Sequence, residues 1–402
     1  MTYASRHWFN GKFFMTTQRW SMLAIFGVFF FESSVIGQWI PRIPDIKSTL
    51  GLSDSELGLA LLAFPLGTMV GLSIAGSLIA HIGLRQSCRI ALPLFSLVFI
   101  GAGWVTTLIG LMIILIFAGI AIGVCETAMN TEAARIERHA GKRLMSRCHG
   151  FWSLGTMVGA LMGAAFADAS VSVGVHFLVI LPLIAVAGFF AASLLPVLTR
   201  VDEQRAEDSN EGAGSVFRLP HRGIVLLCVM PLGIMMVEGA FIDWSAVFMR
   251  DVMSASPWVI GITYSFFSIV MAAVRMAGDT LATRFGDLAL VRVSAIAATV
   301  GIGMFAFSPN TPFALVAAAL CGAGVAVVFP LAVTAAANRS GRSSADNVAA
   351  LNMIAFSAFL LAPPLIGFLS DALNLRIALA VLVPFAFLTF VLSGQIKPRS
   401  ND

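Results

Sequence analysis

Charged residues are scarce in this sequence of 402 residues. Only 11% of its side chains are Asp, Glu, Lys or Arg, whereas a typical soluble domain has about 25%. Twenty-one acids and 25 bases cannot cover a water-soluble chain of this length. The hydrophobic content of 58% and the mean hydropathy of +0.91 indicate that most of the surface faces lipid. These values exclude a soluble enzyme, a secreted disulfide-rich domain and a nucleic-acid binder.

Motifs for metal binding, disulfide formation and ATP use are also missing. The five cysteines occur singly, without CxxC or Cys/His spacing, so we expect buried thiols and no metal site. The sequence has no Walker A motif, haem ligand or catalytic triad, so we expect neither a cofactor nor an enzyme. Any transport by this chain must therefore use an ion gradient or the gradient of the substrate itself.

Long apolar segments are what the sequence does contain. A helix needs about 20 apolar residues to cross a bilayer, and polar or turn-forming breaks divide the chain into twelve such segments. The first is too long for the core of a signal peptide, so we expect it to be retained. The predicted spans are 20–40, 57–80, 89–106, 108–131, 149–168, 173–196, 223–247, 257–283, 288–307, 312–336, 346–369 and 376–395.

The distribution of cations orients these twelve spans. With the N-terminus inside, twenty Lys and Arg residues fall on the inner side and four on the outer side. Cytoplasmic loops carry an excess of Lys and Arg. We therefore expect a multi-pass protein of the bacterial inner membrane with both termini in the cytoplasm.

The sequence divides into two similar halves. Residues 197–222 are charged and lack apolar periodicity, which predicts a cytoplasmic linker between six-helix halves at 1–196 and 223–402. The loop GSLIAHIGLR, which starts at Gly76, is echoed 203 residues later by DTLATRFG, which starts at Asp279. The residues that we expect to form these turns or an inner gate are Gly76, Gly83, Arg85, Arg275, Asp279, Arg284 and Gly286.

The paired loops and the six-plus-six layout resemble the major facilitator superfamily over essentially the whole chain. The loop pattern looks like the family signature G-x-L-a-D-R-x-G-R-R and departs from it at the Asp position, which is Ala80 in one half and Thr283 in the other. Similarity to YbjJ-type bacterial permeases comes from the stretches that begin at Gly123, His149, Glu238, Phe329 and Pro363. This resemblance implies an all-α membrane fold of twelve helices in two pseudo-symmetric halves, which transports a solute by alternating access.

Three glutamates lie inside predicted spans, where an ionisable group is costly and usually functional. Glu32, Glu126 and Glu238 are therefore candidates for proton coupling. The run from Glu126 to Asn130 resembles the fourth helix of fucose-type proton–sugar symporters, and in those the matching glutamate is implicated in proton coupling. The structural alternative is a buried acid that is hydrogen-bonded within the bundle, for Glu126 to Asn130.

A central binding cavity is predicted from spacing along the first helix of each half. Trp39 follows Glu32 by seven residues and Trp244 follows Glu238 by six, so each pair shares a helix face. We expect both pairs to face one cavity, where a tryptophan could stack on a ring-shaped ligand. The candidate cavity residues are Gln38, Trp39, Asn130, Asp243, Trp244 and Asn352.

Several other residues have structural interpretations. Glu132 with Arg135 and Arg275 with Asp279 have the spacing of helical ion pairs. The glycines of the fifth span predict close helix packing. Pro330 and the Pro363–Pro364 pair are expected to break spans ten and eleven.

These observations favour a monomeric, proton-coupled secondary transporter for a small polar or amphipathic solute. Symport is favoured by the resemblance to sugar symporters. Its partners would be the solute, protons and the lipid bilayer, with no nucleic acid. The alternatives are proton-driven efflux of drugs or metabolites, uniport, and a solute sensor that keeps the fold without transporting. A lipid-modifying enzyme would need clustered His, Ser or Asp residues at the membrane interface, which the sequence lacks.

The charge asymmetry predicts the location of the linker and of the C-terminus. Reporter domains fused at Gly212 and at Lys397 should both be active only as cytoplasmic reporters, because both sites follow an even number of spans. An external location of either reporter would contradict the twelve-span topology.

Overall fold

The computed structural model describes residues 3–141, 144–196, 220–340 and 343–397. These ranges contain helices and no strand. Twelve helical segments are long and apolar enough to cross a membrane, and each overlaps one of the predicted spans. Most of the predicted linker, residues 197–219, lies outside the described residues.

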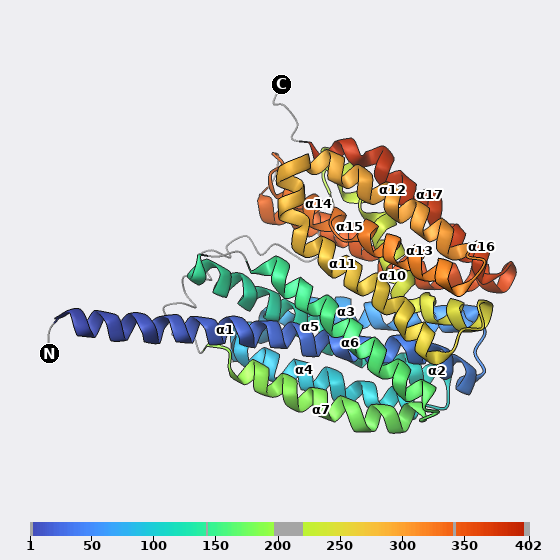
Figure 1. The fold of residues 1–402 in the computed structure, drawn as a ribbon, viewed down its shortest axis with the longest axis horizontal. Coiled ribbons are helices and arrows are strands. Elements are labelled where there is room, and N and C mark those ends of the chain that lie inside the picture. Colours follow the sequence, from blue (N-terminus) through green and yellow to red (C-terminus); the bar gives the residue numbers. More distant parts are fainter. Residues whose placement is uncertain (1–2, 142–143, 197–219, 341–342, 398–402) are drawn as a thin grey trace.

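The helices form two bundles that lie against each other (Figure 1). We refer to residues 3–196 as the N-terminal half and to residues 220–397 as the C-terminal half. The first contains α1 (Tyr3–Trp39), α2 (Ile43–Leu50), α3 (Asp54–Ile82), α4 (Leu84–Ile100), α5 (Leu108–Ala140), α6 (Met145–Asp168) and α7 (Val173–Ser193). The second contains α9 (Val225–Val229), α10 (Leu232–Val247), α11 (Pro257–Phe285), α12 (Asp287–Ala306), α13 (Thr311–Val325), α14 (Val328–Ala337), α15 (Ser344–Ala372), α16 (Leu375–Ala380) and α17 (Leu382–Leu392).

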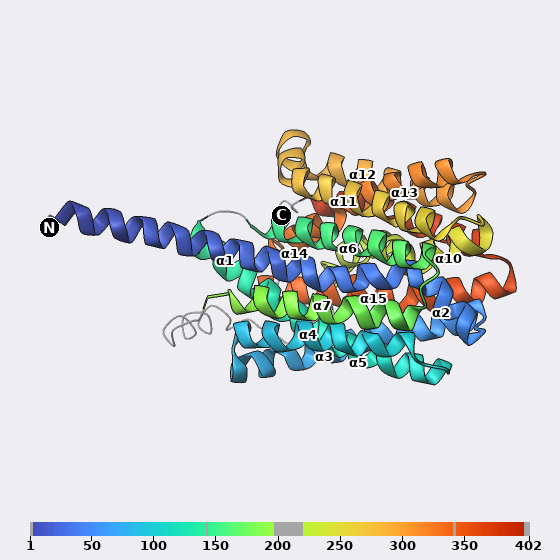
Figure 2. The ribbon, with the colours of Figure 1, turned by 60° about the horizontal axis from the view of Figure 1, so that its bottom comes forward.

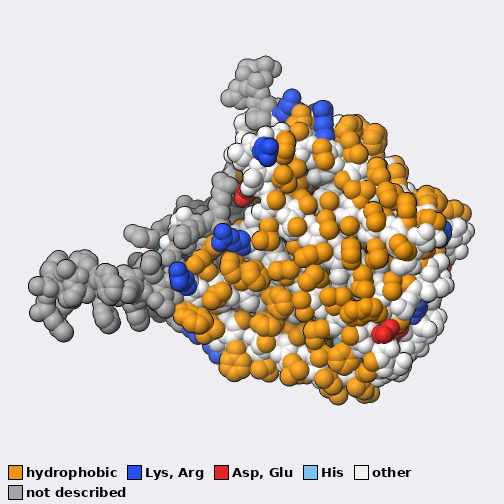
Figure 3. All heavy atoms as spheres, viewed as in Figure 1, with side chains coloured by type: hydrophobic (Ala, Val, Ile, Leu, Met, Phe, Trp, Pro, Cys, Tyr) orange, Lys and Arg blue, Asp and Glu red, His pale blue; other side chains and the backbone are white. Residues whose placement is uncertain are grey.

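The side that holds both termini is called the inner side here, and the opposite side the outer side. The helices run between these two sides (Figure 2). The face shown in Figure 3 is largely covered by hydrophobic side chains, as expected of a surface in contact with lipid. Large exposed side chains such as Ile109 and Phe190 contribute to this apolar surface.

Matching local interactions relate the two halves. Gly83 and Gly286 both adopt a φ of +80° at the inner turns that follow α3 and α11, a conformation that favours glycine. At the start of α4, the Arg89 guanidinium lies 4.8 Å from the centre of the Phe189 ring of α7. Arg292 of α12 lies 5.8 Å from the ring of Phe390 of α17 in the same way. Repeated cation–π contacts therefore tie the inner ends of equivalent spans together.

Glycines bring α6 against α1, as the sequence predicts. A Cβ atom added at Gly159 would lie 2.8 Å from the Cα of Gly37. One added at Gly155 would lie 2.2 Å from the Phe30 carbonyl oxygen. This close approach positions the middle of α1, including Glu32, directly beside α6.

The two proline predictions have different outcomes. Span ten is interrupted at residues 326–327, between α13 and α14, just before Pro330. Span eleven is not broken, because α15 continues from Ser344 to Ala372 through Pro363 and Pro364. Backbone at these prolines instead packs against α3, since a Cβ at Gly58 would lie 2.6 Å from the Pro363 carbonyl oxygen.

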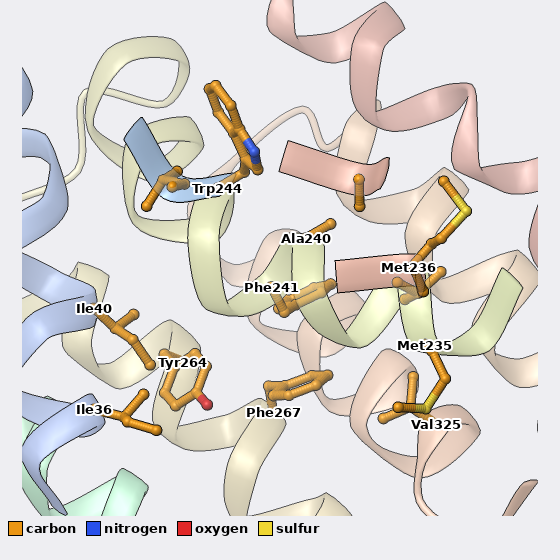
Figure 4. Close-up of a cluster of buried hydrophobic side chains, with 14 of the residues drawn as sticks. Ile36, Ile40, Met235, Met236, Ala240, Phe241, Trp244, Tyr264, Phe267 and Val325 are labelled. Atoms are coloured by element: carbon orange, nitrogen blue, oxygen red, sulfur yellow. The ribbon is translucent and has the colours of Figure 1, made fainter. Parts of the chain in front are cut away.

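Apolar side chains join the halves in the outer part of the membrane. Figure 4 shows Ile36 of α1 and Ile40, which directly follows α1, facing Tyr264 of α11, with Phe241 and Phe267 beside them. The rings of Phe241 and Phe267 are stacked with centres 4.6 Å apart. This layer excludes water between the outer parts of the two halves.

Ionic contacts close the outer ends above this apolar layer. Lys47, beyond α1, bridges Asp54 of its own half at 2.5 Å and Asp251 of the other half at 2.8 Å. The carboxylate of Asp371, near the end of α15, accepts hydrogen bonds from the backbone N–H groups of Asp54 at 3.1 Å and Ser55 at 2.9 Å. These are first-turn N–H groups of α3 that have no partner within their helix. We call Lys47, Asp54, Asp251 and Asp371 the outer seal.

The outer seal leads to a prediction about the equilibrium between closed and open outer ends. D371N removes the charge that interacts with the first turn of α3, which weakens charge-assisted hydrogen bonds and a favourable helix-terminus interaction. We expect the population with separated outer ends to rise about fivefold, for a loss of about 1 kcal/mol. The measurement is the distance distribution between spin labels at the exposed positions Ser48 and Phe307.

The matched control is D168N, which neutralises an exposed carboxylate at the outer end of α6. This variant should leave the distance distribution unchanged. Equal distributions in D371N and wild type would show that the Asp371 contact does not hold the outer ends together.

Candidate functional site

Glu32 lies in the middle of the membrane at the contact between α1 and α6. Its side chain has no exposed surface, and Oε2 accepts a hydrogen bond of 2.9 Å from the indole Nε1 of Trp152. The glycine contacts between the two helices allow this side-chain pair to form. A neutral donor satisfies one oxygen of the carboxyl group without supplying a positive charge.

Glu126 of α5 is half-buried and faces the same region. The carboxyl groups of Glu32 and Glu126 lie close enough to interact electrostatically. Neither carboxylate forms a salt bridge with a described residue. Asn130 donates to the backbone carbonyl of Glu126 at 2.8 Å, so its amide does not satisfy the Glu126 carboxyl group in the way the structural alternative supposed.

Two carboxyl groups in this arrangement can exchange a proton. Like charges held close together in a medium of low dielectric constant repel strongly, and a proton on one group removes this repulsion. The pair is therefore a candidate site for proton binding. Within the described ranges, no three His, Cys, Asp or Glu side chains converge as a metal site.

Glu238, the third candidate, has a cationic partner. Nη2 of Arg275 on α11 lies 2.9 Å from Oε1 of Glu238 on α10. Nε of the same guanidinium donates to the backbone carbonyl of Ala326 at 3.2 Å. The sequence predicted an ion pair between Arg275 and Asp279, whereas the carboxylate that Arg275 binds is on another helix. The spacing rule considers only neighbours on one helix and cannot detect such a pair.

Further polar candidates lie in the C-terminal half. Asp243 of α10 and Asn352 of α15 are half-buried. The hydroxyl of Tyr264 is buried and lies within electrostatic range of both Glu238 and Asp243. His149, at the inner part of α6, lies within electrostatic range of Arg275 across the interface. Groups from both halves thus approach one another near the middle of the membrane.

The predicted cavity tryptophans occupy different surroundings. Trp39 is 5% exposed and packs edge-to-face on Phe99 of α4, with ring centres 5.3 Å apart. Trp244 is fully buried in the apolar cluster shown in Figure 4. Both are packing residues in this conformation, because their large apolar rings fill helix interfaces.

Gln38 also belongs to the packing of the N-terminal half. Its Oε1 lies 2.8 Å from Nε2 of His176 on α7, and the His176 ring stacks on Phe166 at 4.5 Å. The sequence gave no reason to pair Gln38 with His176, because they are 138 residues apart.

The loop residues mainly tie helices together at the inner side. Arg85 donates to the backbone carbonyl of Ser193, and the Arg284 guanidinium lies over the neighbouring Phe285 ring. The Cβ position of Gly76 is open, with no atom within 4 Å. The helical ion pair between Glu132 and Arg135 is present at 2.9 Å, as predicted.

Curated relatives support membership of one family. Residues 21–359 match the profile of the Major Facilitator Superfamily. The chain is 30% identical over 370 residues to the uncharacterized transporter y4wD of Sinorhizobium fredii, covering 92% of this chain and 96% of the relative. It is 27% identical over 387 residues to the membrane protein MosC of Rhizobium meliloti, covering 92% and 90% of the two chains.

Solved structures share the fold at low sequence identity. The nucleoside transporter NupG superposes with a TM-score of 0.73 at 13% identity, over 94% of this chain and 99% of NupG. A D-xylose–proton symporter has a TM-score of 0.70 at 16% identity, over 94% and 96% of the chains. The E. coli fucose:proton symporter FucP has a TM-score of 0.59 at 14% identity, over 94% and 98%. The fold and the family match together establish that this chain is a multi-pass transporter of the major facilitator superfamily.

Proposed function

We propose that this transporter couples the movement of a small polar or amphipathic solute to protons, as a symporter. The observation that carries this proposal is the pair of carboxyl groups of Glu32 and Glu126, which lie close together inside the membrane without a salt bridge to any described residue. Such a pair can bind one proton while the site faces one side of the membrane and release it while the site faces the other.

The outer seal and the apolar layer below it support an alternating-access cycle. Both close the outer ends of the halves, so a bound proton and solute would leave towards the inner side from this conformation. Opening to the outer side would require the contacts of Lys47 and Asp371 across the interface to break. If protons enter from the more acidic outer side, the solute moves inwards together with them.

Two structural neighbours are themselves described as proton symporters, one for fucose and one for D-xylose. At 14% and 16% identity their substrates are not transferred to this chain. The half-buried polar residues Asp243 and Asn352 are the proposed contacts for the solute. We place the protein in the bacterial inner membrane as a monomer with both termini in the cytoplasm.

The test replaces Glu126 by Gln. A thermal-shift screen of the purified protein against sugars, vitamins, nucleobases and organic acids first identifies a ligand. Glutamine preserves the shape of the side chain but cannot carry a proton, so E126Q should lose accumulation of this ligand against its gradient in proteoliposomes with an acidic exterior. Exchange of internal for external ligand should persist, because exchange requires no net proton movement.

The control is E56Q at the outer end of α3. Glu56 accepts from the Ser53 backbone N–H in a capping box, a role that Gln also fills. E56Q should accumulate ligand as the wild type does. Unchanged proton-driven accumulation in E126Q would remove Glu126 from the coupling mechanism.

A further inference from the structure

Span ten contains a carbonyl group that its own helix cannot satisfy. In a continuous helix, the Ala326 carbonyl would accept the N–H of residue 330, four positions later. Residue 330 is Pro330, which has no N–H group. The helix is interrupted at this point, between α13 and α14. A backbone carbonyl inside a membrane needs a donor from elsewhere in the protein.

Arg275 supplies this donor. Its Nε donates to the Ala326 carbonyl at 3.2 Å, and its Nη2 binds the Glu238 carboxylate at 2.9 Å. The planar guanidinium presents these N–H groups in fixed directions, so one side chain binds both acceptors at once. One guanidinium therefore takes part both in the ion pair with α10 and in the hydrogen bond to the backbone carbonyl at the break in span ten.

The N-terminal half lacks this arrangement although it has the matching span. Helix α5 begins 203 residues before α13 and continues without interruption from Leu108 to Ala140. The position that corresponds to Pro330 is Thr127, whose hydroxyl donates to the Gly123 carbonyl at 2.9 Å within the same helix. Leu72 corresponds to Arg275. The fold itself thus does not require a broken span with an external donor.

We propose that Arg275 is a positioning residue that links the charge of Glu238 to the break in span ten and so controls the mobility of α14. The link goes beyond the proposed function, in which Glu32 and Glu126 carry the proton, and it depends on the two contacts that Arg275 makes. Without the charge of Glu238, the guanidinium loses its charged partner and is held less firmly beside Ala326. The inner segment of span ten, α14, then moves more freely relative to α13.

The charged and titratable groups around this link are few. On α11, Arg275 and Tyr264 face Glu238, and on α10 the nearby acid is Asp243. Across the interface, His149 of α6 lies within electrostatic range of Arg275. Removal of the Glu238 charge changes the interaction with Arg275 most directly, because that pair is in hydrogen-bond contact.

Hydrogen–deuterium exchange of the full-length protein in lipid nanodiscs tests the link. E238Q removes the charge that binds Arg275 and should raise the exchange rate of amides 331–337 roughly fivefold, since a hydrogen bond to a charged acceptor is stronger than one to a neutral acceptor. R275K keeps the positive charge but lacks the fork geometry that binds both acceptors, and it should also raise exchange.

P330A distinguishes a specific link from a general loosening of the bundle. Alanine restores the N–H that the Ala326 carbonyl lacks, so α14 should no longer depend on Arg275. In the double variant E238Q/P330A, exchange of amides 331–337 should return to the level of P330A alone. The control variant T127A, at the equivalent position of the other half, should leave α14 unchanged.

The inference is wrong if E238Q leaves α14 exchange at the wild-type rate, or if P330A fails to suppress its effect. Proton-driven uptake by the wild type is measured separately. If P330A suppresses the effect of E238Q on α14 exchange, and uptake does not depend on a pH gradient, the link is supported and the proposed proton coupling is rejected. If uptake depends on the pH gradient but E238Q does not change α14 exchange, only the link is rejected.

Discussion

Burial of carboxyl groups in the membrane is the constraint on which the central region depends. An acid in a low-dielectric environment must pair with a cation, receive hydrogen bonds or carry a proton. The two halves meet this requirement differently. Glu238 has Arg275 at 2.9 Å, whereas Glu32 contacts the neutral indole of Trp152 and interacts with a second acid, Glu126, among the residues that the structure describes.

This difference gives the two halves distinct roles within a symmetric fold. In the N-terminal half, α5 is unbroken and the acid Glu126 that it carries interacts electrostatically with Glu32. In the C-terminal half, the same position in the fold holds an interrupted span, and the cation that balances Glu238 also satisfies the Ala326 carbonyl. We therefore propose that proton binding and helix movement lie on opposite sides of one interface.

Hydropathy was sufficient to predict the twelve spans, and the resemblance of the paired loops to the major facilitator superfamily predicted the fold. All twelve spans and the packing role of the span-five glycines are confirmed, because lipid imposes strong local requirements on length and composition. The site was predicted less completely. Glu32, Glu126 and Glu238 were identified because acids are rare in spans, but the partner of Glu238 and the contact between Gln38 and His176 depend on helix packing. Trp39 and Trp244 share a helix face with their glutamates and nonetheless pack into helix interfaces. The outer seal joins residues such as Asp54 and Asp371 that no local spacing rule relates.

Infrared difference spectroscopy of the protein in lipid tests the central claim most directly. The spectrum of the wild type minus that of the E32Q/E126Q double variant isolates the vibrations of this one carboxyl pair at neutral pH. A shared proton predicts a carbonyl stretching band of a protonated carboxyl group in this difference. A difference that contains only the bands of ionised carboxylates would contradict the account, because the pair would then hold no proton to couple to transport.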